Sequence, residues 1–176
     1  MTRLISIGLA AAGLGFCMLA GNVMAADKPS DAQIAHIAYT AGDLDIKAAE
    51  LALKNASSEA VRSFANDMLR DHKAVNDKAL ALVKKLNVTP EDNATSQSLV
   101  KQANEKQAEL AKLSGAAFDK AYADNELAYH KTVNEALKTT LIPSSQNGEL
   151  KSFLETGLKI FQGHEQHAEH VASALK

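Results

Sequence analysis

Five side chains able to bind a metal ion stand on the apolar faces of predicted helices. They are three histidines and two acidic residues: Asp45, His72, Glu126, His130 and His164. Burying such a group without a hydrogen-bonding partner costs about 1–3 kcal/mol, so each one needs a compensating interaction. Imidazole and carboxylate groups on facing helices suit Zn, Cu, Fe or Mn. The pattern therefore predicts either a transition-metal site or a hydrogen-bonded polar layer inside a helical core.

A short repeat links two of these histidines. Residues 64–76 read FANDMLRDHKAVN and residues 122–134 read YADNELAYHKTVN, with identities at six of thirteen positions. His72 and His130 occupy equivalent places, and in both copies a His-Lys-x-Val-Asn run follows without a gap. Because this run is longer than helical patterning alone requires, it favours an internal duplication.

The depth of each group in its predicted helix places the five in one layer. The three histidines and Asp45 each lie about 14 to 17 residues from the start of their helix, or ~21–26 Å along it. Antiparallel helices of similar length meet at their middles. Glu126 lies one turn before His130 on the same face. We therefore expect the five side chains to converge.

The histidines near the C-terminus do not form a metal motif of their own. His164, His167 and His170 are spaced i, i+3, i+6, which differs from the His-Glu-x-x-His pattern of zinc proteases. This spacing directs His164 inward, His167 to the border of the apolar face and His170 to solvent.

Haem held through Met68 or His72 is a further alternative, since two axial ligands on facing helices are geometrically feasible.

Helical periodicity predicts the elements that carry these groups. Starting and ending signals place helices at about residues 31–55, 58–87, 90–113, 116–140 and 149–175. Almost no chain separates the first helix from the second, so these two should fold back antiparallel. The third is polar along its length and is predicted as an exposed connection. The fold class is therefore all-α: an antiparallel four-helix bundle with an additional connecting helix.

The first 25 residues have the pattern of a secretory signal. Arg3 gives a positive start, an apolar run follows from Leu4 to Ala20, and small residues end at Ala25. The apolar run is short for a membrane span, which needs ~20 residues, so cleavage after Ala25 is favoured over an uncleaved anchor. Residues 26–176 would then form one helical-bundle domain in the periplasm, without a stable membrane anchor.

Composition excludes several other functions. The net charge is −2, and loss of Arg3 with the signal would make it −3, so no excess of basic residues argues for nucleic acid or an anionic membrane. The single cysteine, Cys17, lies in the predicted signal. The mature chain would therefore have no disulfide, no thiol nucleophile and no c-type haem attachment. Partners are left open, including a second copy of the chain.

Several stretches are shared with one known family. They are residues 65–72 (ANDMLRDH), residues 113–122 (LSGAAFDKAY), His130, and His164 following LKSF at 150–153. Together they resemble domain of unknown function 4142, a family of exported bacterial proteins, over nearly the whole mature chain. The resemblance implies a ferritin-like bundle in the cell envelope and no established activity.

The number of acidic residues predicted to face inward differs from that of a ferritin-like di-iron site. Such sites use about four carboxylates and two histidines. Here only Asp45 and Glu126 are clear inward acids, and Ala65 and Met68 occupy the turn before His72. A single histidine-rich site, or none, is expected instead of a di-iron centre.

Three kinds of function remain open from the sequence. The first is a non-enzymatic metal-binding or envelope stress protein. The second is a redox enzyme using iron or manganese, which needs an open coordination position and a channel. The third is a structural or interaction protein whose polar layer fixes the helix register. The sequence identifies no catalytic residue and favours a non-enzymatic role.

Overall fold

The computed structural model describes residues 28–175, and these residues form helices and no β-strand. The all-α prediction is therefore confirmed for this range, while the predicted signal, residues 1–25, lies outside it. The long helices are α1 (Asp31–Asn55), α2 (Glu59–Lys85), α3 (Ala94–Leu110), α4 (Gly115–Ala136) and α6 (Gly148–Ala174). A π-helical turn, η1 (Leu137–Leu141), and the short α5 (Ile142–Ser144) join α4 to α6.

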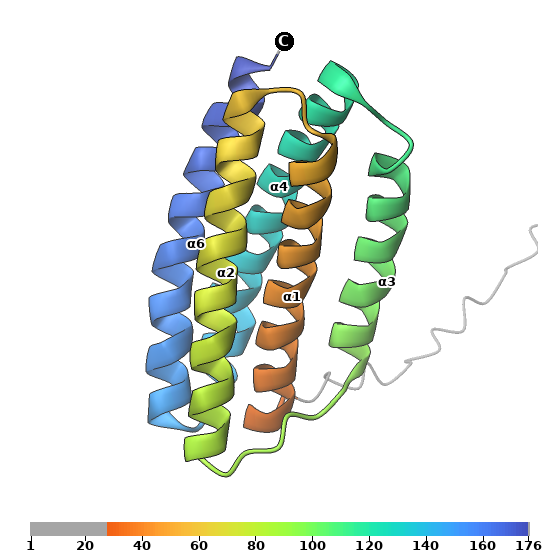
Figure 1. Ribbon diagram of the computed structural model, residues 1–176. Helices are drawn as coiled ribbons and strands as arrows, with labels where there is room; N and C mark the ends of the chain where they lie inside the picture. Colours follow the sequence, from red (N-terminus) through yellow and green to blue (C-terminus); the bar gives the residue numbers. More distant parts are fainter. Residues whose placement is uncertain (1–27, 176) are drawn as a thin grey trace, which may run out of the picture.

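Helices α1, α2, α4 and α6 lie side by side, and α3 lies outside them against α1 (Figure 1). The most extensive contacts join α1 to α2 and α4 to α6, whereas α1 and α4 meet over a smaller area. Since α3 contacts both α1 and α4, it covers the side on which those two helices meet. Within residues 28–175, no helix is long and apolar enough to span a membrane.

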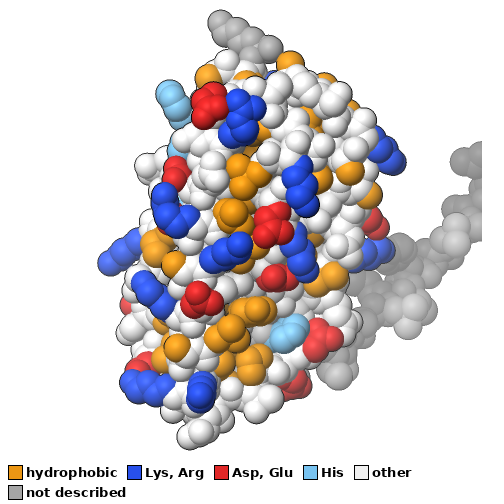
Figure 2. All heavy atoms as spheres, viewed as in Figure 1, with side chains coloured by type: hydrophobic (Ala, Val, Ile, Leu, Met, Phe, Trp, Pro, Cys, Tyr) orange, Lys and Arg blue, Asp and Glu red, His pale blue; other side chains and the backbone are white. Residues whose placement is uncertain are grey.

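The apolar core consists of two clusters on either side of the middle of the helices. On α1, Ile34 and Ile37 belong to one cluster, Ala48 and Ala52 to the other, and Asp45 lies between them. Helix α6 has the same division, with His164 at the boundary. The outer surface differs from this apolar core in being charged: lysine, arginine and acidic side chains are interspersed over the face seen in Figure 2. Packing on both sides therefore positions the polar layer between two apolar regions.

Two aspartates hold the tight turns that connect these helices. Asp119, buried near the start of α4, accepts hydrogen bonds from the backbone N–H groups of Ser57 (3.0 Å) and Ser58 (2.8 Å) and from the Ser57 hydroxyl. Asp31, at the start of α1, accepts in the same way from backbone N–H groups of the 145–147 turn at 2.8 and 2.9 Å. Each turn thus uses a carboxylate from a distant helix to satisfy its backbone donors.

The third helix begins later than predicted. The sequence places its start at Pro90, but α3 begins at Ala94 with Asn93 as N-cap. The Asn93 side chain accepts from the Ser96 N–H at 3.0 Å, and the Ser96 hydroxyl accepts from the Asn93 N–H at 3.2 Å. Both the 89–92 and the 93–96 segments carry capping signals, and the reciprocal pair of hydrogen bonds favours the second.

The predicted loop at residues 141–148 is also mostly helical. Helix α4 continues into the π-helical turn, where the Ile142 N–H donates to the Leu137 carbonyl five residues earlier. Pro143 lies in the first turn of α5, where its missing N–H costs no hydrogen bond. Only residues 145–147 remain as a turn. Helix α4 and its extension are therefore longer than the Pro-Ser-Ser sequence indicates.

Replacing Asp119 with Ala should lower the free energy of unfolding by about 2–4 kcal/mol, because three donors of the Ser57-Ser58 turn lose a buried acceptor. Urea unfolding measures this. Asp124→Ala is the matched control, since Asp124 lies on the same helix, is exposed and pairs only with Lys120 among the described residues. That control should change stability by less than ~0.5 kcal/mol. Equal small effects of both substitutions would contradict the role of Asp119.

Candidate metal centre

Four helices bring together all five of the predicted side chains. Helix α1 supplies Asp45, α2 supplies His72, α4 supplies Glu126 and His130 on successive turns, and α6 supplies His164. All five are buried. They form two overlapping groups, in each of which the ligand atoms lie within 4.8 Å of one another: the three histidines, and His130 with the two acids. The depth of these residues in their helices was thus sufficient to place them together.

The Asp45 carboxylate lies between two imidazoles. Its Oδ2 atom is 3.2 Å from Nε2 of His72 and 3.4 Å from Nε2 of His130. Neither contact has the geometry of a hydrogen bond, and no described residue donates one to either carboxylate oxygen. Asp45 therefore presents both oxygens, without hydrogen-bond donors, to the centre of the layer.

Two of the histidines are held by hydrogen bonds at their outer nitrogens. Nδ1 of His130 lies 2.9 Å from the Glu126 carbonyl oxygen, an acceptor only, so Nδ1 carries the proton and donates it. Nε2 of His164 lies 3.1 Å from the Asp71 carboxylate and donates in the same way. The other nitrogens, Nε2 of His130 and Nδ1 of His164, are buried and without partners. This arrangement fixes the tautomers and leaves a lone pair on each inner nitrogen, as in metal-binding histidines.

His72 is positioned by packing instead of by hydrogen bonds. Its ring stacks on that of Phe161, with centroids 4.8 Å apart and planes 7° apart, and both its nitrogens lack partners. The centroids of the His72, His130 and His164 rings lie 5.2 to 5.8 Å from one another. Three imidazoles thus surround one small volume, next to the Asp45 carboxylate.

Burial shifts the pKa values of this layer toward the neutral forms. It lowers the pKa of His72 to about 3, aided by the nearby His164, and it lowers the pKa of His130 against the attraction of Asp45. Burial also raises the pKa of Asp45, and it raises that of Glu126 well above the ordinary value, with Asp45 adding to the effect. A bound cation would reverse the carboxyl shifts, because it favours the ionised form.

The number of buried polar atoms without partners distinguishes the two predicted kinds of layer. Seven such atoms belong to the five residues: Asp45 Oδ1 and Oδ2, His72 Nδ1 and Nε2, Glu126 Oε2, His130 Nε2 and His164 Nδ1. A layer satisfied by its own hydrogen bonds would pair most of them, since each unpaired group costs about 1–3 kcal/mol. A divalent cation would satisfy several at once. The donor set therefore fits a metal ion better than a self-sufficient polar network.

The composition of the cluster also limits the kind of metal centre. Two carboxylates and three histidines converge, fewer acids than a ferritin-like di-iron site uses. Met68 is buried in one of the apolar clusters instead of in the polar layer. Helix α6 directs its other histidines as predicted, with His167 partly exposed and His170 exposed.

Two contributions to the layer were not anticipated from the sequence. Asp71 holds His164 and is itself held by the Arg70 guanidinium at 2.8 Å. The Asn that ends each copy of the repeat ties its helix to a neighbour: Asn76 donates to the Tyr39 carbonyl at 3.3 Å, and Asn134 donates to the Phe161 carbonyl at 3.2 Å. The shared Asn of the repeat was a signal for this contact, whereas nothing in the sequence indicated Asp71.

Comparison with known proteins identifies the family. A family model described as a domain of unknown function (DUF4142) matches residues 19–171, which is most of the chain. The chain therefore belongs to this family, as the shared stretches indicated. No curated protein and no solved structure matched the chain.

Protonation of His72 should destabilise the metal-free protein as the pH falls from about 6.5 toward 3. The pKa of His72 is lowered to about 3 in the folded state, whereas the ordinary value is near 6.5. Its contribution to the free energy of unfolding is therefore complete above pH 6.5. Below that pH the contribution falls by about 1.4 kcal/mol per pH unit. Asp45 and Glu126 have raised pKa values, so each contributes the opposite slope from the ordinary carboxyl value near 4 upward, where it offsets part of the His72 contribution. Urea unfolding in a chelator at several pH values measures the total.

His72→Leu should flatten the acid limb of this profile, because the substitution removes the group that resists protonation. His170→Leu is the matched control, since it removes an exposed histidine and should keep the wild-type slope. Identical acid limbs for wild type and His72→Leu would mean that His72 is not the group responsible.

Proposed function

We propose that this DUF4142 protein is exported to the periplasm and binds one transition-metal ion there, without being an enzyme. The ligands would come from Asp45, His72, Glu126, His130 and His164. All of them lie in residues 28–175, so the proposed site needs nothing from the predicted signal. We further propose that the helices have a ferritin-like arrangement, in which α3 is the connection between the pair α1 and α2 and the pair α4 and α6.

The observation that carries this proposal is the state of the imidazole nitrogens. His130 and His164 each use the outer nitrogen in a hydrogen bond and leave the inner nitrogen free and buried. A polar layer that only fixed the helix register would be expected to pair the inner nitrogens as well. A metal ion accounts for both features, because it needs the lone pair and is favoured by the outer hydrogen bond.

Charge balance points to a divalent ion. The ligands offer neutral imidazoles and two carboxylates, so one divalent cation brings the formal charge of the buried layer to zero. Uncompensated charge in such a place is costly, which makes this balance favourable. Nitrogen and oxygen donors together suit Zn, Cu, Fe or Mn.

A redox enzyme is the second candidate, and one observation favours it. A cavity reaches His72 and His130 from the surface, so a small molecule has a route to the proposed ion. Consumption of peroxide or oxygen by the iron- or manganese-loaded protein, abolished by His130→Ala, would replace the non-enzymatic proposal with this one.

Untagged protein freed of metal and then loaded with Zn, Cu, Fe or Mn should retain about one ion per chain for at least one of them after desalting. Elemental analysis and a thermal shift measure this. His130→Ala should reduce the content to less than about 0.2 per chain, since it removes the residue common to both ligand groups. A His167→Ala, His170→Ala double variant should retain the ion. Equal loss in both variants, or no retained ion in wild type, would contradict the proposal.

Asp71→Ala should weaken metal binding by about 10- to 100-fold, because the His164 ring loses the acceptor that orients it. Calorimetric titration measures the affinity. Asp67→Ala is the matched control, since Asp67 lies one turn earlier on α2 and also pairs with Arg70 at 2.8 Å, without contacting His164. Equal affinities of the two variants would exclude an orienting role for Asp71.

A further inference from the structure

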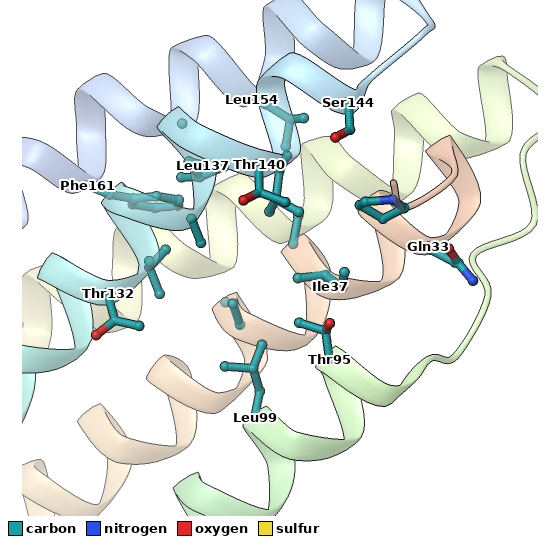
Figure 3. A pocket seen from close by; sticks show the side chains of 18 of the residues that line it. Gln33, Ile37, Thr95, Leu99, Thr132, Leu137, Thr140, Ser144, Leu154 and Phe161 are labelled. Atoms are coloured by element: carbon teal, nitrogen blue, oxygen red, sulfur yellow. The ribbon is translucent and has the colours of Figure 1, made fainter. Parts of the chain in front are cut away.

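A large cavity opens beside the polar layer. Its volume is about 770 Å³, and it extends from the surface between α1, α3 and η1 inward to His72 and His130. Figure 3 shows side chains of α1, α3, α6 and the end of α4 arranged around this space. Its wall is mainly apolar, as the following lining residues illustrate: Ile37, Leu99, Leu137, Leu154 and Phe161. The volume lies in the range of small-molecule sites in proteins, ~300–1,000 Å³.

We propose that this cavity binds a single-chain amphiphile with a carboxylate head, such as a saturated fatty acid of about twelve carbons. The chain lies along the apolar wall with its tail toward His72 and Phe161. The carboxylate remains at the mouth. The head group at the mouth lies away from the ligand atoms of the proposed metal ion, and binding does not depend on an ion being bound.

The charges around the cavity favour an anionic head at the mouth. Lys28 is the one lysine or arginine that lines the cavity in the described part of the chain, and no aspartate or glutamate lines it there. Thr95, Thr139 and Thr140 add hydroxyl groups. No lysine or arginine of residues 28–175 lines the inner end, where the cavity reaches His72 and His130.

The length of the cavity matches the proposed chain. Along α1 it extends from Gln33 to Gly42, and along α4 and η1 from Thr140 back to His130. Nine to ten helical residues correspond to ~13–15 Å. An extended chain advances ~3.5 Å for every three bonds, so this depth spans about eleven to thirteen bonds and holds a chain of about twelve carbons.

Small residues keep the cavity wide where the chain would lie. Gly157 of α6 lines it, and a Cβ atom added there would meet only the Phe161 ring, at 3.5 Å. A larger side chain at this position therefore fits the helix but enters the cavity. Gly163 lies on the same helix, has nothing within 4 Å of an added Cβ and does not line the cavity. The two glycines give a matched pair for testing occupancy.

Displacement of dansyl-undecanoic acid by dodecanoate tests the proposal, with metal-free and zinc-treated protein in parallel. Gly157→Leu should lower the affinity for both ligands by at least about tenfold, because the leucine side chain fills the volume that the acyl chain would occupy. Gly163→Leu should bind within about twofold of wild type, although it makes the same gain in helix propensity. Circular dichroism checks the fold, and Ala79→Phe, on the part of the wall that α2 supplies, replaces Gly157→Leu if the latter does not fold.

The head group is tested separately. Lys28→Gln should lower the affinity for dodecanoate by about five- to tenfold and leave the affinity for dodecanol unchanged. Absence of binding, or unchanged affinity in Gly157→Leu, would overturn the cavity assignment. Equal affinity of wild type for dodecanol and dodecanoate would overturn the anionic head, and binding only after zinc treatment would overturn its location at the mouth. Since metal-free protein is used in one arm, failure of the metal proposal leaves this result interpretable.

Discussion

The carboxylate of Asp45 is buried among imidazoles, no residue within 28–175 donates a hydrogen bond to either oxygen, and the rest of the structure is arranged around that constraint. Burial raises the pKa of Asp45, because the ionised form is costly where no donor or cation compensates its charge. Helices α1, α2 and α4 must meet at one depth for Asp45 to approach His72 and His130. Apolar clusters on both sides hold them there, so the packing of the core fixes the geometry of the polar layer.

The layer is asymmetric in what supports it. His130 and His164 are held by hydrogen bonds at their outer nitrogens, whereas His72 is held by stacking on Phe161. Phe161 and His72 also line the apolar cavity, together with His130, so a ligand in the cavity would contact the least constrained imidazole. The proposed metal site and the proposed amphiphile site would therefore share a wall. A ligand bound in either site would contact the His72 ring.

Residues on helical faces were predictable because periodicity and depth are local properties. His72 and Asp45 could be placed together by counting residues, since each lies near the middle of its helix. The contact of Asp71 with His164 depends on how α2 and α6 pack sideways, which no local pattern records. The start of α3 was misplaced because two capping signals compete within 89–96. The cavity depends on which side chains of α1, α2, α3, α4 and α6 surround one space, so it too is a property of packing.

The coordination of a bound ion is the most direct test of this account, and X-ray absorption spectroscopy of the metal-loaded, untagged protein measures it. Three imidazoles with one or two carboxylate oxygens around one ion are expected, with one imidazole lost in His164→Ala and none in the exposed His170→Ala. A spectrum of oxygen ligands alone, or one that His164→Ala leaves unchanged, would contradict the central claim that the buried layer is a metal site.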